Sequence, residues 1–293
     1  MKAFANYHPI VLFCYFILVV GFTMFYMHPV YLIISLILST ILSIQVNKES
    51  FLNGLKWMIP LFLIAALINP LITHDGEKII LYIDNNPITI EAIAYGFAMS
   101  IMICSVIFWF GCYSAVMTSD KFLYLFGKIS PAFALVISLT LRLFPRFKHQ
   151  IGVISNAQKT IGMDISSGNL FHRIKCGIRI ISILITWALE NAIETADSMK
   201  ARGYGLPDRS TFSLFTFEKR DGIMLSLLLI LAITNVSGSF LNNNDFYFYP
   251  TFSEITFDEI SILLYGSYTL LLAIPSIIEL WEALKWRSLK SNN

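Results

Sequence analysis

The chain has 293 residues, of which 56% are hydrophobic and only 14% charged, with a net charge of +2 and a mean hydropathy of +0.67. A soluble domain of this length needs far more charge to cover its surface. The composition therefore excludes a soluble globular protein and indicates an integral membrane protein. The four cysteines have neither metal-ligand nor disulfide spacing, and we interpret them as small apolar residues.

Six charge-free stretches are apolar enough to cross a bilayer, which takes about 20 residues of helix. They are Pro9–Met27, Pro29–Val46, Trp57–Thr73, Ala92–Met117, Ile223–Leu241 and Ile260–Ile278. Residues 78–91 interrupt this pattern after the third stretch. Two β-prone runs there flank Asp84-Asn85-Asn86-Pro87, which predicts a small hairpin.

Lysine and arginine predict the orientation, because they concentrate in cytoplasmic segments. With six crossings and the N-terminus inside, 20 of the 21 basic residues lie on the inner side, and only Lys78 lies outside. Fourteen of them fall between the fourth and fifth stretches. The outer loops are acidic instead. We therefore expect a multi-pass membrane protein with both termini cytoplasmic.

Two shorter apolar runs, Pro131–Leu141 and Ile180–Leu189, lie within this basic segment. We interpret both as too short to cross alone. If both runs crossed the membrane, the basic residues between them would lie on the outer side. We expect helices that dip into the inner leaflet or pack beneath the spans.

The basic segment is predicted to form three helices. The first begins at Ser119-Asp120 and has a second start signal at Ser130-Pro131, where a capping serine precedes a proline. The second runs from about Arg146 to Ile161. The third runs from about Ile178 to Ala201, and Gly203, Gly205 and Pro207 end it.

The predicted fold is thus an all-α integral membrane protein with six transmembrane helices, long cytoplasmic coupling helices and a small extracellular β-hairpin. We divide it into three parts. Residues 1–117 hold four transmembrane helices, 118–221 the coupling segment, and 222–293 two further transmembrane helices and a cytoplasmic tail.

The sequence Ala201-Arg202-Gly203 ends the third helix. Taken alone it is an ordinary helix C-terminus, with a glycine past the end and a cation near the dipole. Its context favours a functional interpretation, because a long helix leaving the membrane would present an arginine at its tip. A guanidinium there can make a bidentate contact with a partner's carboxylate.

The chain resembles the transmembrane T-component of energy-coupling-factor transporters, the CbiQ/EcfT family of vitamin and metal uptake systems. The resemblance covers nearly the whole chain and implies the plasma membrane of a prokaryote. It is carried by Asn69-Pro70-Leu71, Pro87-Ile88-Thr89-Ile90-Glu91, Tyr95-Gly96, Ser119-Asp120-Lys121, Ser130-Pro131, Leu141-Arg142-Leu143-Phe144-Pro145 and Ser198-Met199-Lys200-Ala201-Arg202-Gly203-Tyr204. The last motif is the specific one.

This resemblance implies two crossed coupling helices, each ending in an Ala-Arg-Gly-like motif whose arginine enters a groove on an ABC ATPase. It also implies a membrane-embedded substrate-binding S-component, and ATP and Mg bound by the ATPases, with no cofactor, metal or catalytic residue in this chain. The first motif departs from the family pattern, because Ile161 stands in the arginine position of Ala157-Gln158-Lys159-Thr160-Ile161-Gly162. We therefore favour two different ATPases over two copies of one.

The candidate residues fall into two groups. For ATPase docking they are Met199, Ala201, Arg202, Gly203, Lys159, Ile161, Gly162 and Arg209. For the S-component contact they are Ala132, Ala134, Ile181, Ile185 and Ala188.

The positions of charged residues and histidines relative to the spans distinguish rival functions. An ion-coupled transporter or membrane enzyme would place carboxylates or histidines within its spans. The predicted spans have none, and no glycine-rich phosphate loop is present. A membrane scaffold that recruits another cytoplasmic partner remains the alternative. Some of the basic residues should also contact anionic lipid of the bilayer, and no nucleic-acid partner is expected. The sequence does not identify the transported substrate.

Overall fold

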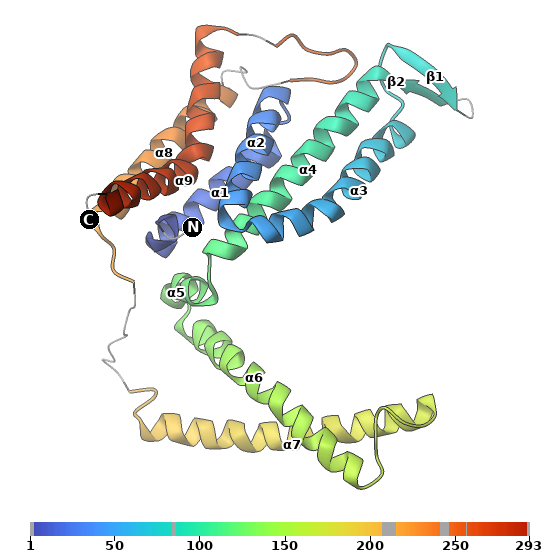
Figure 1. The fold of residues 1–293 in the computed structure, drawn as a ribbon, viewed down its shortest axis with the longest axis vertical. Coiled ribbons are helices and arrows are strands. Elements are labelled where there is room, and N and C mark those ends of the chain that lie inside the picture. Colours follow the sequence, from blue (N-terminus) through green and yellow to red (C-terminus); the bar gives the residue numbers. More distant parts are fainter. Residues whose placement is uncertain (1–2, 84–85, 207–214, 241–245, 256, 292–293) are drawn as a thin grey trace. The chain divides into compact units, whose positions relative to one another are not determined.

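A computed structural model describes residues 3–83, 86–206, 215–240, 246–255 and 257–291. The chain divides into two compact units, Met1–Phe122 with Phe215–Asn293, and Leu123–Leu214. The transmembrane helices of the first unit and the long helices of the second can be followed in Figure 1. Each unit is treated by itself below.

The first unit is helical apart from one hairpin. Its elements in chain order are a short 3-10 helix Phe4–Asn6, α1 (Pro9–Phe25), α2 (Pro29–Val46), α3 (Lys48–Ile72), β1 (Ile79–Ile83), β2 (Asn86–Thr89), α4 (Ile90–Val116), α8 (Lys219–Phe240) and α9 (Glu259–Ser291). The second unit holds α6 (Pro131–Thr160) and α7 (Leu170–Ala201). The boundary between the units falls inside α5 (Ser119–Ile129).

The all-α fold with six helices long and apolar enough to cross a membrane is confirmed for the described residues. Five of them, α2, α3, α4, α8 and α9, correspond to expected spans. The sixth is α7, whereas the expected first span, α1, is a shorter apolar helix of 17 residues. The predicted hairpin is also confirmed, with β1 antiparallel to β2.

Two predicted helix boundaries are wrong. We expected a separate helix to begin at about Arg146, but α6 runs unbroken through Pro145. A proline inside a helix removes one N–H donor and its ring clashes with the carbonyl four residues earlier, which is why a break is expected there. The rest of the helix nevertheless continues across Pro145. The third helix begins at Leu170 rather than Ile178, because the Asn169 side chain caps it by accepting from the Leu170 N–H at 2.8 Å.

The core of the first unit is polar as well as apolar. The helix α4 packs against α1, α2 and α3, and α9 packs against α2 and α8. At their centre the buried Ser35 hydroxyl accepts from Trp109 Nε1 at 3.0 Å and lies 3.0 Å from the Thr23 hydroxyl. Thr23 also lies 3.3 Å from the Tyr268 hydroxyl. One small cluster therefore joins α1, α2, α4 and α9.

The N-terminal segment is tied to the C-terminal helices by hydrogen bonds. Its Phe4 N–H donates to Glu279 of α9 at 3.1 Å, and the His8 N–H donates to the buried Asp221 of α8 at 3.1 Å. The Arg220 guanidinium donates to the Asn6 carbonyl at 3.2 Å. These contacts hold the start of α1 against α8 and α9.

Candidate functional site

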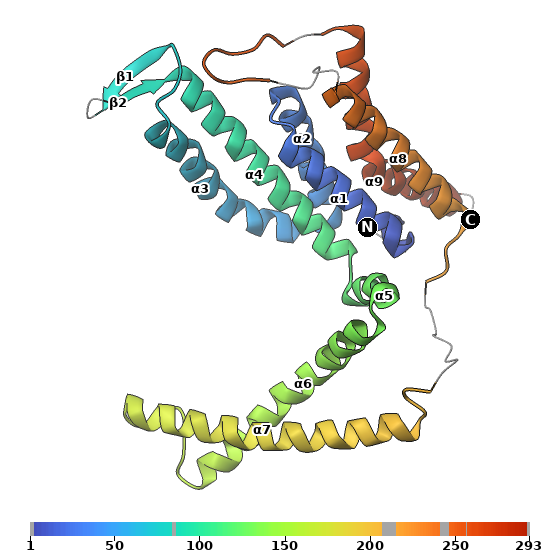
Figure 2. The same cartoon turned by 180° about the vertical axis from the view of Figure 1, so that it is seen from behind.

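The two long helices of the second unit cross each other, as Figure 2 shows from behind. The rings of Phe147 and Trp187 meet at the contact, with centroids 5.6 Å apart. Ile154 and Gln158 of α6 and Ile180 of α7 are buried. The crossing leaves the C-terminal end of each helix accessible.

These two ends have the same backbone geometry. After α6, the Gly162 N–H donates to the Lys159 carbonyl at 3.1 Å and the Met163 N–H to the Gln158 carbonyl at 3.0 Å. Both glycines that follow the helix ends have positive φ, 78° at Gly162 and 79° at Gly203.

After α7 the pattern repeats residue for residue. The Gly203 N–H donates to the Lys200 carbonyl and the Tyr204 N–H to the Met199 carbonyl, both at 2.9 Å. Paired bonds of this kind around a left-handed glycine form a Schellman cap. The caps align Ile161 with Arg202, so the two side chains occupy equivalent positions at the helix ends.

The side chains at the two ends differ in charge. Arg202 is exposed, and among the residues that the structure describes it has no ion-pair partner. Ile161 is 67% exposed. Lys159, which we expected to support docking at this end, instead forms an ion pair with Asp164 at 3.2 Å. Hydrogen bonds from Ser166 and Lys159 lower the pKa of Asp164 to about 2, so the carboxylate stays ionised to balance the lysine.

A groove of about 440 Å³ lies between α6 and α7 beside the Arg202 end. Arg142 and Arg146 of α6 line it together with Arg202, and Glu194 of α7 is a wall residue. Three guanidiniums facing one carboxylate give the groove a net positive charge. The sequence motifs alone predicted no docking role for Arg142 and Arg146. Their spacing of four residues was the available signal, because it places them on one helix face.

The other predicted site residues fall as follows. Met199 lines the same groove, Ala201 and Gly162 are exposed, and Gly203 is half-buried. Arg209 lies outside the described residues. Of the residues proposed to contact an S-component, Ala132, Ile181 and Ile185 are exposed, and Ala134 and Ala188 are half-buried.

The exposed apolar residues of α7 form one stripe. Phe171, Ile174, Ile178, Ile181 and Ile185 recur every three or four residues, and each is more than half exposed. Ile180 and Cys176, on the other side of the helix, are buried. The stripe is thus uncovered within the described part of the chain.

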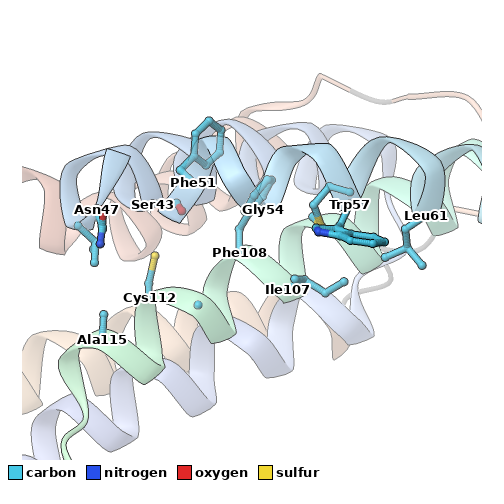
Figure 3. Close-up of a pocket in the computed structure, with 13 residues that line it drawn as sticks. Ser43, Asn47, Phe51, Gly54, Trp57, Leu61, Ile107, Phe108, Cys112 and Ala115 are labelled. Carbon is cyan, nitrogen blue, oxygen red and sulfur yellow. The ribbon is translucent and has the colours of Figure 1, made fainter. Parts of the chain in front are cut away.

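A second hollow lies in the first unit, between α2, α3 and α4, with a volume of about 440 Å³ (Figure 3). Its lining is mostly apolar, and Gly54 and Gly111 widen it, because a Cβ added at either glycine would meet open space. Trp57 stands at its edge, 81% exposed. The polar lining residues Ser43 and Asn47 offer no charge, so this hollow is not the candidate site.

The family comparison covers most of the chain. A family model described as "CbiQ: Cobalt transport protein" matches residues 7–213, which includes both capped helix ends. The chain belongs to this family. The matched region confirms the resemblance inferred from the motifs, and it ends before α8 and α9 begin.

Individual relatives in the same family are energy-coupling factor transporter transmembrane proteins. The chain is 28% identical to EcfT of Streptococcus equi over 200 residues, covering 64% of this chain and 74% of the relative. It is 28% identical to EcfT of Lactococcus lactis over 216 residues, covering 68% and 79%. A shorter match to EcfT of Brevibacillus brevis is 38% identical over 101 residues and covers 34% and 38%.

The matched caps predict that Gly203→Ala and Gly177→Ala change stability in opposite directions. Gly203 has φ of 79°, where a Cβ costs about 1–2 kcal/mol, and the added atom would lie 3.0 Å from Leu206. Gly177 lies within α7 with open space around it, so alanine should stabilise the helix by about 0.5–1 kcal/mol. Hydrogen exchange should therefore quicken at the C-terminal end of α7 in the first variant and slow around residue 177 in the second. Equal exchange in both would contradict the cap.

Proposed function

We propose that this chain is the transmembrane coupling subunit of an energy-coupling-factor importer. In this proposal two ABC ATPase subunits bind the ends of α6 and α7, and a membrane-embedded S-component binds the same helices nearer the bilayer. The ATPases bind and hydrolyse ATP with Mg. This chain transmits their opening and closing to the S-component, which carries a vitamin or metal ion.

The observation that carries the proposal is the pair of equivalent helix ends on two crossed helices. A rigid helix transmits a push at its end along its whole length, and crossing lets two pushes meet at one contact. The Schellman caps fix the last turn of each helix, so that displacement of a partner moves the helix rather than unwinding it. Membership of the CbiQ family and the names of the relatives support the same function.

The charge at the Arg202 end supports an acidic partner surface. Arg202 shares its groove with Arg142 and Arg146, and Glu194 offsets only part of this charge. A partner carboxylate entering the groove would form charge-assisted hydrogen bonds, which are stronger than neutral ones. Arg142 and Arg146 are therefore added to the proposed docking residues.

The uncovered stripe of α7 supports a second, apolar partner. An exposed apolar stripe on one face of a helix needs either lipid or protein to cover it. We propose that the S-component covers the part around Ile181 and Ile185, together with Ala132, Ala134 and Ala188. Small alanines at this contact would let the two surfaces slide.

We propose that α7 does not cross the membrane, although its length and composition would allow it. Its charge-free core lies between Arg179 and Glu190, and its ten residues span about 15 Å of helix, half of the hydrocarbon thickness. In this proposal both termini and the ends of α6 and α7 lie in the cytoplasm.

The proposed orientation predicts the accessibility of single cysteines in sealed cells. Lys159→Cys and Tyr204→Cys should react only after the membrane is permeabilised, whereas Glu77→Cys, beside the hairpin, should react from outside. All three positions are exposed, so labelling reports topology rather than burial. External labelling at residue 159 would mean that α6 and α7 cross, and the coupling function would be wrong.

Charge reversal at Arg202 should weaken ATPase assembly. Breaking a buried charged contact of this kind costs about 2–5 kcal/mol, whereas reversing an exposed surface charge costs about 0–1 kcal/mol. The variants are Arg202→Glu and, as a control on the exposed surface of α6, Lys148→Glu. Co-purification in mild detergent should lose an ATPase only in the first, with membrane insertion unchanged. Full recovery of the ATPases with Arg202→Glu would remove the docking role.

Substitutions at Ile161 test whether the two docking contacts differ. Ile161→Asp should weaken assembly, because a carboxylate would be desolvated without a partner. Val153→Asp places the same charge at an exposed apolar position within α6 and serves as the control. Ile161→Arg should weaken assembly too if the facing groove is apolar. Two different ATPase species should then be found in the purified complex, and a single species in two copies would contradict this.

A further inference from the structure

Three soft donor atoms meet directly behind the Ile161 end of α6. The Cys176 sulfur lies 3.7 Å from the Met163 sulfur and 3.5 Å from Nε2 of His172. Cys176 is only 1% exposed. Thiol, thioether and imidazole thus share one small space, all within the second unit.

The local backbone places all three residues. The main chain of Met163 is held by its N–H bond to the Gln158 carbonyl in the Schellman cap. His172 and Cys176 stand four residues apart and so share a face of α7. Gly168 has φ of 87°, and a Cβ there would lie 3.0 Å from the His172 ring, so the loop passes close over the imidazole.

The loop between the helices is braced on its other side. Arg173 Nε donates to the Ile165 carbonyl at 2.8 Å, and Asp164 accepts from the Ser166 N–H at 2.9 Å. With the ion pair from Lys159, these bonds fix the loop independently of the three donors. The cluster is therefore preorganised rather than the product of a collapsed loop.

The spacing of the donors suits one metal ion. If bond lengths of about 2.3 Å to sulfur and about 2.0 Å to nitrogen, the values for zinc, are used as a guide, each of the two separations subtends an angle of about 108° at one ion. The two pairs of donors are therefore close enough together to bind a single ion. An ion can thus bind with small movements of the side chains.

The donor set selects the class of ion. Thiolate and thioether ligands select soft ions such as Cu(I), whereas hard divalent ions prefer oxygen. Among the described residues no group of three or more His, Cys, Asp or Glu side chains could hold a metal, so the methionine is what completes this cluster. We propose that Met163, His172 and Cys176 bind one soft monovalent metal ion of the copper(I) class. The Cys176 thiol releases its proton to solvent as the bond forms, and no electron is transferred.

The position of the ion has a consequence that rests on the proposed function. Met163 follows Ile161 by two residues, so a bound ion would join the α6 end to α7 through three bonds. The docking surface at Ile161 would then be locked to the neighbouring helix. Metal binding is measured on the chain alone, so its failure is distinguishable from failure of ATPase docking.

The test is a Cu(I) titration of the full chain in detergent without oxygen. Cu(I) is supplied as its complex with bathocuproine disulfonate, whose absorbance falls as the protein takes the ion. We expect one equivalent bound by the unaltered chain. Cys176→Ser should weaken affinity by at least about 100-fold and Met163→Leu or His172→Gln by at least about 10-fold, while Cys14→Ser and His149→Gln on other surfaces should leave it unchanged.

Two further measurements decide the identity of the site. X-ray absorption of the copper-loaded chain should show two sulfurs and one nitrogen around the metal. Equal affinity in the unaltered chain and in all three ligand variants would overturn the site. Binding of Zn(II) but not Cu(I), lost in the same variants, would overturn the assignment to a soft monovalent ion. Because Met163→Leu and His172→Gln keep the thiol, the test does not depend on Cys176→Ser folding.

Discussion

The first unit depends on one buried hydroxyl. Ser35 lies where α1, α2, α4 and α9 come together, and it satisfies the Trp109 indole while contacting Thr23. In a bilayer the apolar effect cannot distinguish a helix neighbour from lipid, so helices associate through packing and through polar contacts of this kind. A hydrogen bond also has a fixed direction, which apolar packing lacks. The cluster therefore sets the rotation of each helix about its axis, and the surrounding rings of Tyr15, Tyr31 and Tyr268 pack in the arrangement that it leaves.

The second unit is organised differently. Its two helices share one contact and have ends of the same backbone form with unlike side chains. One end offers guanidiniums in a groove, and at the other the charge of Lys159 is neutralised by Asp164. In the proposed function, the side chains at the two ends would select the two partners, and the shared backbone caps would carry the movement. The two requirements could then be met separately.

Much of the fold could be predicted because charge and apolar length are one-dimensional properties. Five of the six expected spans follow from these properties, whereas the hairpin, the Ser130-Pro131 helix start and the glycine stop after Arg202 follow from local turn and capping residues. The continuity of α6 through Pro145 could not be predicted, because local rules end or kink a helix at an interior proline. The ion pair between Lys159 and Asp164 could not be predicted either. It requires the exact path of a turn around Gly162. Arg142 and Arg146 of α6 meet Arg202 only because α6 and α7 cross. In the same way, Met163 of the loop meets His172 and Cys176 of α7 only in the folded unit.

The tie between the N-terminal segment and the last helices bears on how the chain is made. Phe4 finds its partner at Glu279, and His8 finds its partner at Asp221, more than two hundred residues later in synthesis. A ribosome delivers the first segment long before α8 and α9 emerge, so water holds these N–H donors until Asp221 and Glu279 replace it. The contacts that fix the start of α1 therefore form only after the last two helices have been made, and the folding of one end of the chain is completed by the other.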